Sequence, residues 1–145
     1  MRVIIQRCKN AKVTVDNNIV GKINEGLLLL VGFTIGDDSS TIDYMIDKII
    51  NLRIFDDDSG VMNKSLIDIN GSILSVSQFT LYADATKGRR PSYVKALPGS
   101  SAVNLYNEFN TKIKNKGINI EMGIFGAEMQ VALVNDGPIT ILLEK

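Results

Sequence analysis

The chain has 145 residues, of which 45% are hydrophobic and 22% charged, and its 16 basic and 16 acidic residues cancel to a formal net charge of zero at pH 7. This length and composition predict a single globular domain spanning residues 1–145 and exclude a disordered or fibrous protein. The absence of histidine excludes Ser-His and Cys-His nucleophile pairs, histidine general bases and nearly all catalytic zinc sites.

The first part of the chain is expected to form strands. β-Branched residues and alternation over Val3–Val15 predict a strand, and Asp16–Asn18 supplies the residues of a hairpin turn. A short strand is expected over Ile19–Ile23. The continuous apolar run Leu27–Phe33 that follows is typical of a strand buried on both faces.

Two helices are predicted from apolar residues that recur with the period of an α-helix. The first covers Ser39–Leu52, with Ser39 or Ser40 as its N-cap, and the second begins near Ser100–Ser101 and ends at Gly117. The apolar positions are Ile42, Met45, Ile46, Ile49 and Ile50 in the first helix and Ala102, Val103, Leu105, Tyr106, Phe109 and Ile113 in the second. Each helix therefore needs a sheet to cover its apolar stripe.

The remaining elements are expected to be strands. They are Ser72–Leu81, Ile118–Met122, Met129–Val134 and Ile139–Leu143, the last two joined by a tight turn. The whole order predicts an α/β (α+β) fold with a largely antiparallel, barrel-like sheet covered by two amphipathic helices. The longest connection runs from about Tyr82 to Gly99, and loops of that length in compact domains are usually functional.

Polar residues interrupt the apolar strand at Ser77-Gln78-Phe79-Thr80. Strand alternation would place Ser77 and Phe79 on one face with Ser75, and Gln78 and Thr80 on the other. This pattern is common on a solvated sheet face. It also fits a pocket wall at which Gln78 and the hydroxyls orient a substrate.

The segment Asn135–Thr140 contains residues that tolerate positive φ, followed by a proline, and so predicts a tight turn. A turn alone is one interpretation. The other is a cis bond between Gly137 and Pro138, which would point backbone carbonyls in an unusual direction.

Two further segments carry candidate binding residues. Glycines flank Phe125, and Phe125 and Met129 fit either core packing or a sandwich around a flat ring. Residues 84–95 hold four basic residues and one acid, a local sum of 4 − 1 = +3 in a neutral chain. That loop is either merely solvated or a phosphate contact. Its basic residues are Lys87, Arg89, Arg90 and Lys95.

Other features indicate no chemistry of their own. The acidic run Asp56–Gly60 lacks the spacing of a calcium loop and is expected to be a solvated turn. Cys8 is the only cysteine, so it forms no internal disulfide and is expected to be a structural thiol. The chain contains neither a signal-peptide core nor an apolar stretch of membrane-spanning length, and a cytoplasmic location without a membrane is expected.

Two motifs together, SQFTL at Ser77–Leu81 and NDGPIT at Asn135–Thr140, resemble the paired signature of the D-aminoacyl-tRNA deacylase (D-tyrosyl-tRNA(Tyr) deacylase) family. The similarity continues through IIQR at Ile4–Arg7, VTVD at Val13–Asp16, RIFDD, MN, KGRRPSY and AEMQVALVNDGPIT, in the same order and over essentially the whole chain. Ile139, where valine is expected, changes the volume little.

The resemblance implies a homodimer in which a Gly-cisPro segment of one subunit enters the active site of the other. Gly137 and Pro138 would form the chirality filter, with their carbonyls where an L side chain would have to go. Arg7 would hold the Gly137 carbonyl by a charge-assisted hydrogen bond. Such a filter does not reject glycine, so the implied substrates are D-aminoacyl-tRNA and glycyl-tRNA(Ala).

The resemblance also implies how the substrate lies. The terminal adenosine would contact Phe125 and Met129, and Ser77-Gln78-Phe79-Thr80 would bound the ester, with the N–H groups of Phe79 and Thr80 stabilising the oxyanion. The basic loop with Lys87, Arg89, Arg90 and Lys95 would meet acceptor-stem phosphates. No cofactor or metal is expected.

The mechanism depends on what can activate water. A threonine at position 80 without a neighbouring base is inert at neutral pH, and the chain has no histidine. The expected mechanism is therefore substrate-assisted, with the vicinal 2′-hydroxyl of the RNA positioning or activating water. Two other functions remain open: a non-catalytic module that binds the 3′ end of RNA, and an esterase that acts on small esters through Ser77 or Thr80.

Overall fold

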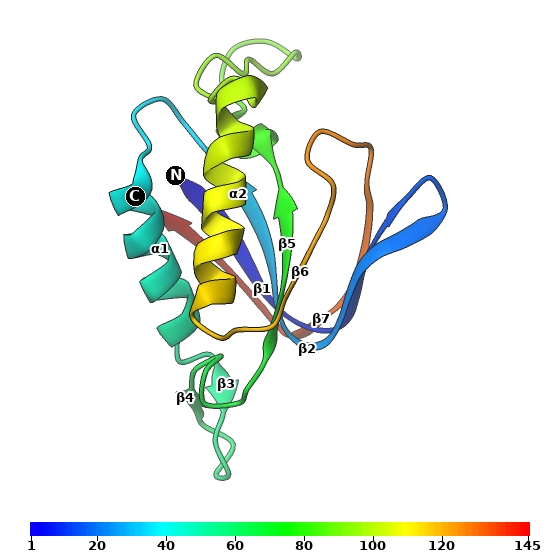
Figure 1. The fold of residues 1–145 in the computed structure, drawn as a ribbon, viewed down its shortest axis with the longest axis vertical. Coiled ribbons are helices and arrows are strands. Elements are labelled where there is room, and N and C mark those ends of the chain that lie inside the picture. Colours follow the sequence, from blue (N-terminus) through cyan, green and yellow to red (C-terminus); the bar gives the residue numbers. More distant parts are fainter.

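The computed structural model describes residues 1–145 as one mixed sheet with two helices on the same side of it (Figure 1). The sheet has five strands in the order β6-β5-β2-β1-β7, and β3 and β4 form a separate hairpin. The elements are β1 (Arg2–Val15), β2 (Asn18–Gly32), α1 (Ser39–Asn51), β3 (Phe55–Asp56), β4 (Met62–Lys64), β5 (Ser72–Ser77), the 3₁₀-helix η1 (Phe79–Tyr82), α2 (Gly99–Asn115), β6 (Ile120–Met122) and β7 (Gln130–Glu144).

The predicted α/β class is confirmed, and the sheet is antiparallel over its longest strands. β1 pairs antiparallel with β2 and β7, whereas the shorter β5 pairs parallel with β2 and with β6. The barrel-like closure is not confirmed, because β6 and β7 stand at opposite ends of the strand order. No helix combines the length and the apolarity that crossing a membrane requires.

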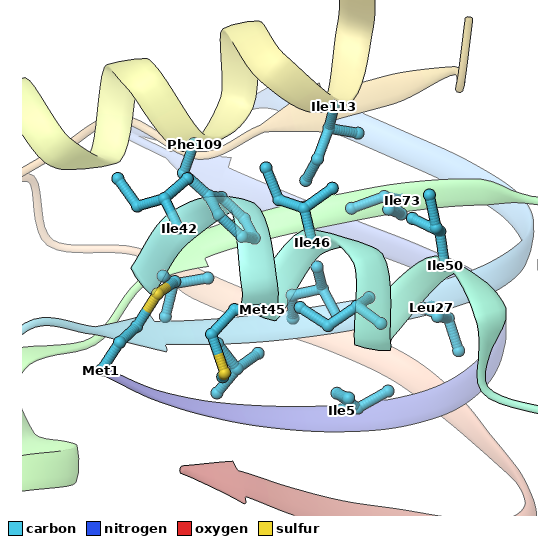
Figure 2. Packing of buried hydrophobic residues seen from close by; sticks show 14 of the residues in the cluster. Met1, Ile5, Leu27, Ile42, Met45, Ile46, Ile50, Ile73, Phe109 and Ile113 are labelled. Atoms are coloured by element: carbon cyan, nitrogen blue, oxygen red, sulfur yellow. The ribbon is translucent and has the colours of Figure 1, made fainter. Parts of the chain in front are cut away.

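The helix-covered face holds a cluster of 20 buried hydrophobic residues. In Figure 2, Ile42 and Ile46 of α1 meet Phe109 and Ile113 of α2 above the sheet. All five predicted apolar positions of α1 are buried. Burying a large aliphatic or aromatic side chain contributes roughly 1.5–3 kcal/mol, so this layer is the main source of stability.

The opposite face of the sheet has a smaller apolar cluster of seven buried residues, among them Cys8, Leu28 and Leu74. Neither helix covers this face (Figure 1). Its outer members, including Leu30, Val131 and Leu133, are only partly buried. The prediction that Leu27–Phe33 is buried on both faces is confirmed, since Leu27 and Leu29 belong to the larger cluster and Leu28 to the smaller.

The predicted N-cap of α1 is wrong by one residue. Asp38, not Ser39 or Ser40, caps the helix, with its carboxylate accepting the Thr41 N–H at 2.8 Å. The Ser40 hydroxyl donates to the same oxygen at 2.7 Å. These hydrogen bonds, that of the Thr41 N–H first, lower the pKa of Asp38 to about 2.

Several strand boundaries also differ from the prediction, and two of these differences bear on the site. β2 is one strand where two were expected, because Gly26 continues the pairing at φ +147 and leaves no space for a Cβ against the Ser72 backbone. β5 ends at Ser77 instead of Leu81, and the chain turns into η1. The predicted alternation across Phe79 and Thr80 is therefore wrong, because those residues lie on a 3₁₀ turn.

Candidate active site

A pocket of about 600 Å³ opens where β2 and β5 end. Two segments that lie far apart in the sequence meet in it: Ser77-Gln78-Phe79 at the end of β5, and Phe125 with Met129 from the connection between β6 and β7. Tyr93 of the long loop also lines it. The 18 lining residues are mostly apolar and include no acid, lysine, arginine or cysteine. Thr80 stands one residue beyond the lining.

Gln78 is fixed by the neighbouring strand. Its backbone N–H donates to the carbonyl of Val31 at 2.7 Å, which extends the β2–β5 pairing by one residue. A Cβ at Gly32 would stand 2.8 Å from the Gln78 carbonyl oxygen, so glycine permits this close approach. Arg2 steadies the far end of η1 by donating to the Leu81 carbonyl at 2.9 Å.

The 3₁₀ turn leaves polar groups of the predicted site unpaired. The N–H groups of Phe79 and Thr80 have no hydrogen-bond acceptor within the protein, as is usual at the start of a helical turn. The side-chain amide of Gln78 donates to the Thr80 hydroxyl oxygen. An amide is no base, so this contact orients the hydroxyl without activating it.

The segment with Phe125 and Met129 is tied to β5 and α2. The Gly123 N–H and the Tyr106 hydroxyl both donate to the Ser75 carbonyl, each at 2.9 Å. The Phe125 ring stands 5.7 Å from that of Tyr106, centroid to centroid. The sequence pattern marked Tyr106 only as an apolar position of the helix, because nothing local links it to residues 75 and 123.

The Gly137–Pro138 peptide bond is cis, but the segment is not the predicted hairpin turn. β7 is one strand through Asn135–Pro138, and the irregularity appears in its pairing with β1 between Gln6 and Cys8. Because β7 pairs with β1 both before and after this irregularity, Asn135–Pro138 forms part of a continuous strand and not a hairpin turn. Both Gly137 and Pro138 are exposed, and neither lines the pocket of its own chain.

Arg7 lies buried beneath this segment and supports it, one residue earlier than expected. Its Nε donates to the carbonyl of Asp136 at 3.3 Å, not to that of Gly137. It also pairs with the Asp136 carboxylate at 3.1 Å and donates to the Ile54 carbonyl at 2.8 Å. Asp136, which the sequence pattern marked only as a turn residue, is thus one of two carboxylates that pair with Arg7, the other being Asp56 at 3.6 Å.

The tip of the basic loop carries Lys87, Arg89 and Arg90, none of which lines the pocket. All three are exposed and make no ion pair. Lys95 instead pairs with Asp84 at 3.6 Å. The predicted cluster therefore divides into three cations without an ion pair and one, Lys95, that is paired with a carboxylate.

Two other predictions concern groups outside the pocket. Cys8 is buried, and burial raises the pKa of its thiol to about 11, which agrees with the expected structural thiol. The Asp56–Gly60 run belongs to the β3–β4 hairpin, where the Asp57 carboxylate accepts the N–H groups of Ser59 and Val61. A hydrogen-bonded turn is therefore what that run forms.

Comparison with known proteins adds independent evidence. The family model described as D-Tyr-tRNA(Tyr) deacylase matches residues 4–144. Proteins named D-aminoacyl-tRNA deacylase from Thermosipho africanus and Clostridioides difficile are 58% and 56% identical to the chain, each over 99% of this chain and 97% of its own length.

Solved structures agree on the fold. A protein named c-Myc DNA Unwinding Element Binding Protein superposes with a TM-score of 0.94 at 39% identity, over 100% of this chain and 99% of its own. A probable eukaryotic D-amino acid tRNA deacylase superposes with a TM-score of 0.83 at 18% identity, over 98% of this chain and 97% of its own. The chain belongs to the D-Tyr-tRNA(Tyr) deacylase family, a family of hydrolases.

Proposed function

We propose that the chain hydrolyses the ester between a D-amino acid and the 3′ end of tRNA. The observation that carries this proposal is the meeting of Phe125 and Met129 with the Ser77-Gln78-Phe79 strand end in one pocket. An aromatic ring and a thioether suit the flat adenine of a terminal adenosine. The strand end beside them would then bound the aminoacyl ester.

The chemistry of the lining supports substrate-assisted hydrolysis. Water attacks the ester carbonyl carbon, the bond to the ribose 3′-oxygen breaks, and that oxygen leaves with a proton as free tRNA and D-amino acid form. The pocket lining contains no carboxylate, lysine, histidine or thiol that could act as a general base. The 2′-hydroxyl of the substrate would position the water, and the unpaired N–H groups of Phe79 and Thr80 would stabilise the oxyanion.

The mechanism is tested with a D-aminoacyl-tRNA that ends in 2′-deoxyadenosine and is charged at its 3′-hydroxyl. We expect it to bind like the ribose substrate and to be hydrolysed about 10²–10³ times more slowly, by analogy with removal of one positioned oxyanion donor. Equal turnover of the two substrates would contradict this mechanism and would indicate that protein side chains, Thr80 and Gln78 first, activate the water.

Chiral selection would come from a second copy of the chain. Gly137 and Pro138 are exposed and stand outside the pocket lining of their own chain, so they are available to the pocket of another. The partly buried apolar face of the sheet is a surface that such a homodimer would cover. A filter made of backbone excludes an L side chain and passes glycine, so glycyl-tRNA(Ala) would also be a substrate.

The free cations at the loop tip would contact phosphates of the acceptor stem. Lys87, Arg89 and Arg90 make no ion pair, whereas Lys95 would have to leave Asp84 to do the same. Binding of tRNA should therefore weaken as salt rises, and charge reversal in the loop tip should reduce that dependence.

The function itself is tested by release of amino acid from matched D- and L-aminoacyl-tRNA and from a small D-amino acid ester. We expect release from the D-aminoacyl-tRNA alone. Equal hydrolysis of the small ester would indicate the esterase that Ser77 or Thr80 could serve. Binding of the tRNA end without release would indicate an RNA 3′-end-binding module.

A further inference from the structure

Two exposed aromatic rings stand together at the rim of the pocket. Phe79 of η1 is 57% exposed and Tyr93 of the long loop is 42% exposed, and both line the pocket. Their ring centroids are 5.1 Å apart and the ring planes meet at 63°. Phe79 and Tyr93 form what we call the rim pair. Aromatic side chains left this open at a pocket mouth have faces available to a flat ligand.

The loop that carries Tyr93 also carries the free cations. Its tip, with Lys87, Arg89 and Arg90, is closed by two backbone hydrogen bonds between Asp84 and Ser92, at 2.8 and 2.9 Å. On the C-terminal side of Tyr93, the Thr34 hydroxyl holds the backbone by donating to the Lys95 carbonyl at 2.6 Å. Tyr93 is therefore held at the base of the loop, next to the pocket, while the cations extend from the tip.

From this arrangement we infer a second nucleotide subsite, in which the rim pair stacks the unpaired nucleotide on the 5′ side of the terminal adenosine. The inference rests on the proposed function. Single-stranded RNA is bound by aromatic rings that stack its bases beside cations that neutralise its backbone, and the rim pair and the loop tip supply both. The subsite takes one unpaired nucleotide of either base class, because stacking does not read base edges.

Binding tests the subsite without any catalysis. The probes are the trinucleotide cytidyl-cytidyl-adenosine and adenosine alone, titrated by calorimetry into the full chain. We expect the trinucleotide to bind more tightly than adenosine. Tyr93→Ala should remove about tenfold of that advantage, the usual loss for one stacked base, and Tyr93→Phe should keep most of it.

A matched control is Tyr44→Ala, which removes an equally exposed tyrosine on α1, away from the pocket. It should bind both probes as the unmodified chain does. An equal affinity of the unmodified chain for the two probes would overturn the subsite. So would a Tyr93→Ala variant that keeps the full advantage of the trinucleotide.

Kinetics separate stacking from simple support of Phe79. The measurement is the ratio of kcat/KM for a D-aminoacyl trinucleotide to kcat/KM for the D-aminoacyl adenosine. We expect Tyr93→Ala to lower this ratio about tenfold. An equal fall with both substrates would mean that Tyr93 only holds Phe79, and an unchanged ratio with a shifted monomer–dimer equilibrium would mean that a second copy covers the rim pair. Either result overturns the subsite. Failure to hydrolyse any of these esters, with the binding difference intact, would sink only the proposed function.

Discussion

At the scale of single residues, the Thr80 hydroxyl separates two mechanisms. It accepts a hydrogen bond from the Gln78 amide and has no base beside it. A covalent mechanism would require a proton acceptor there, because an alcohol is a poor nucleophile until it loses its proton. The proposed oxyanion donors, the N–H groups of Phe79 and Thr80, belong to the backbone and would not depend on that side chain.

We therefore expect Thr80→Ala to lower kcat by about tenfold or less, the loss of one ordinary hydrogen bond. Removing a true nucleophile costs about 10⁶ in the serine-protease case. Single-turnover deacylation of D-aminoacyl-tRNA measures the difference, with circular dichroism as the control for folding. A collapse of the protease size in a folded variant would contradict the substrate-assisted mechanism.

At the scale of elements, two contacts decide how the helices support the site. Asp38 begins α1, and Tyr106 of α2 joins the Gly123 N–H at the Ser75 carbonyl. The first contact is local and concerns stability. The second joins three separate segments and so concerns the shape of the pocket.

Replacing the cap tests the first contact. Asp38→Ala should lower the midpoint of thermal unfolding by a few degrees, and Asp38→Asn, which also caps well, should restore most of it. The folded pKa of Asp38, about 2, lies below its ordinary value, so its charge stabilises the fold above about pH 4 and that contribution is lost as the pH falls toward 2. The advantage of the native chain over Asp38→Asn should therefore shrink on acidification, as thermal melts from pH 6 to 2 would show. An advantage that grows at low pH would contradict this role.

Removing the Tyr106 hydroxyl tests the second contact. Tyr106→Phe keeps the ring beside Phe125 but loses the hydrogen bond to the Ser75 carbonyl, for a cost of about 1 kcal/mol in unfolding free energy. Since Phe125 lines the pocket and is proposed to contact the terminal adenosine, we expect KM to rise several-fold with little change in kcat. The opposite split, with kcat falling at constant KM, would show that the contact acts on the chemical step.

At the scale of the whole molecule, the helices cover one face of the sheet and leave the other face, called the open face, uncovered. Both helices cover the same face (Figure 1), and the cluster on the other face ends in partly buried residues such as Leu30 and Leu133. Leu142 is 57% exposed, and strand alternation puts it on the open face because Ile141 and Leu143 pack against the helix-side cluster. A second copy would remove this apolar surface from water.

Leu142→Lys should therefore shift a homodimer toward monomer, since it puts a charge on the open face and spares the core. Sedimentation velocity should show the change while the far-ultraviolet spectrum stays native. If the filter is supplied across the interface, the monomer should lose discrimination between D- and L-aminoacyl-tRNA. Ile35→Lys, at a loop position 71% exposed, is the matched control and should remain dimeric. A native chain that is monomeric and fully active would contradict the proposal.

The features of the fold that depend on local sequence patterns could be predicted from the sequence alone. These features are the apolar stripe of α1, the burial of Leu27–Phe33 on both faces and the mixed fold class. They depend on the spacing of apolar residues, which is visible in the sequence. The end of β5 does not: Ser77-Gln78-Phe79-Thr80 favours a strand locally, but the Val31 carbonyl takes the Gln78 N–H and the chain turns into η1. Asn135–Pro138 favours a hairpin locally, but pairing with β1 on either side makes it part of one strand. The catalytic and filter roles of those residues, and the single domain, stay predictions. Only the tertiary structure brings Phe125 and Met129 to the β5 end, because a pocket is made by contacts between distant segments, and no local pattern encodes which distant segments meet.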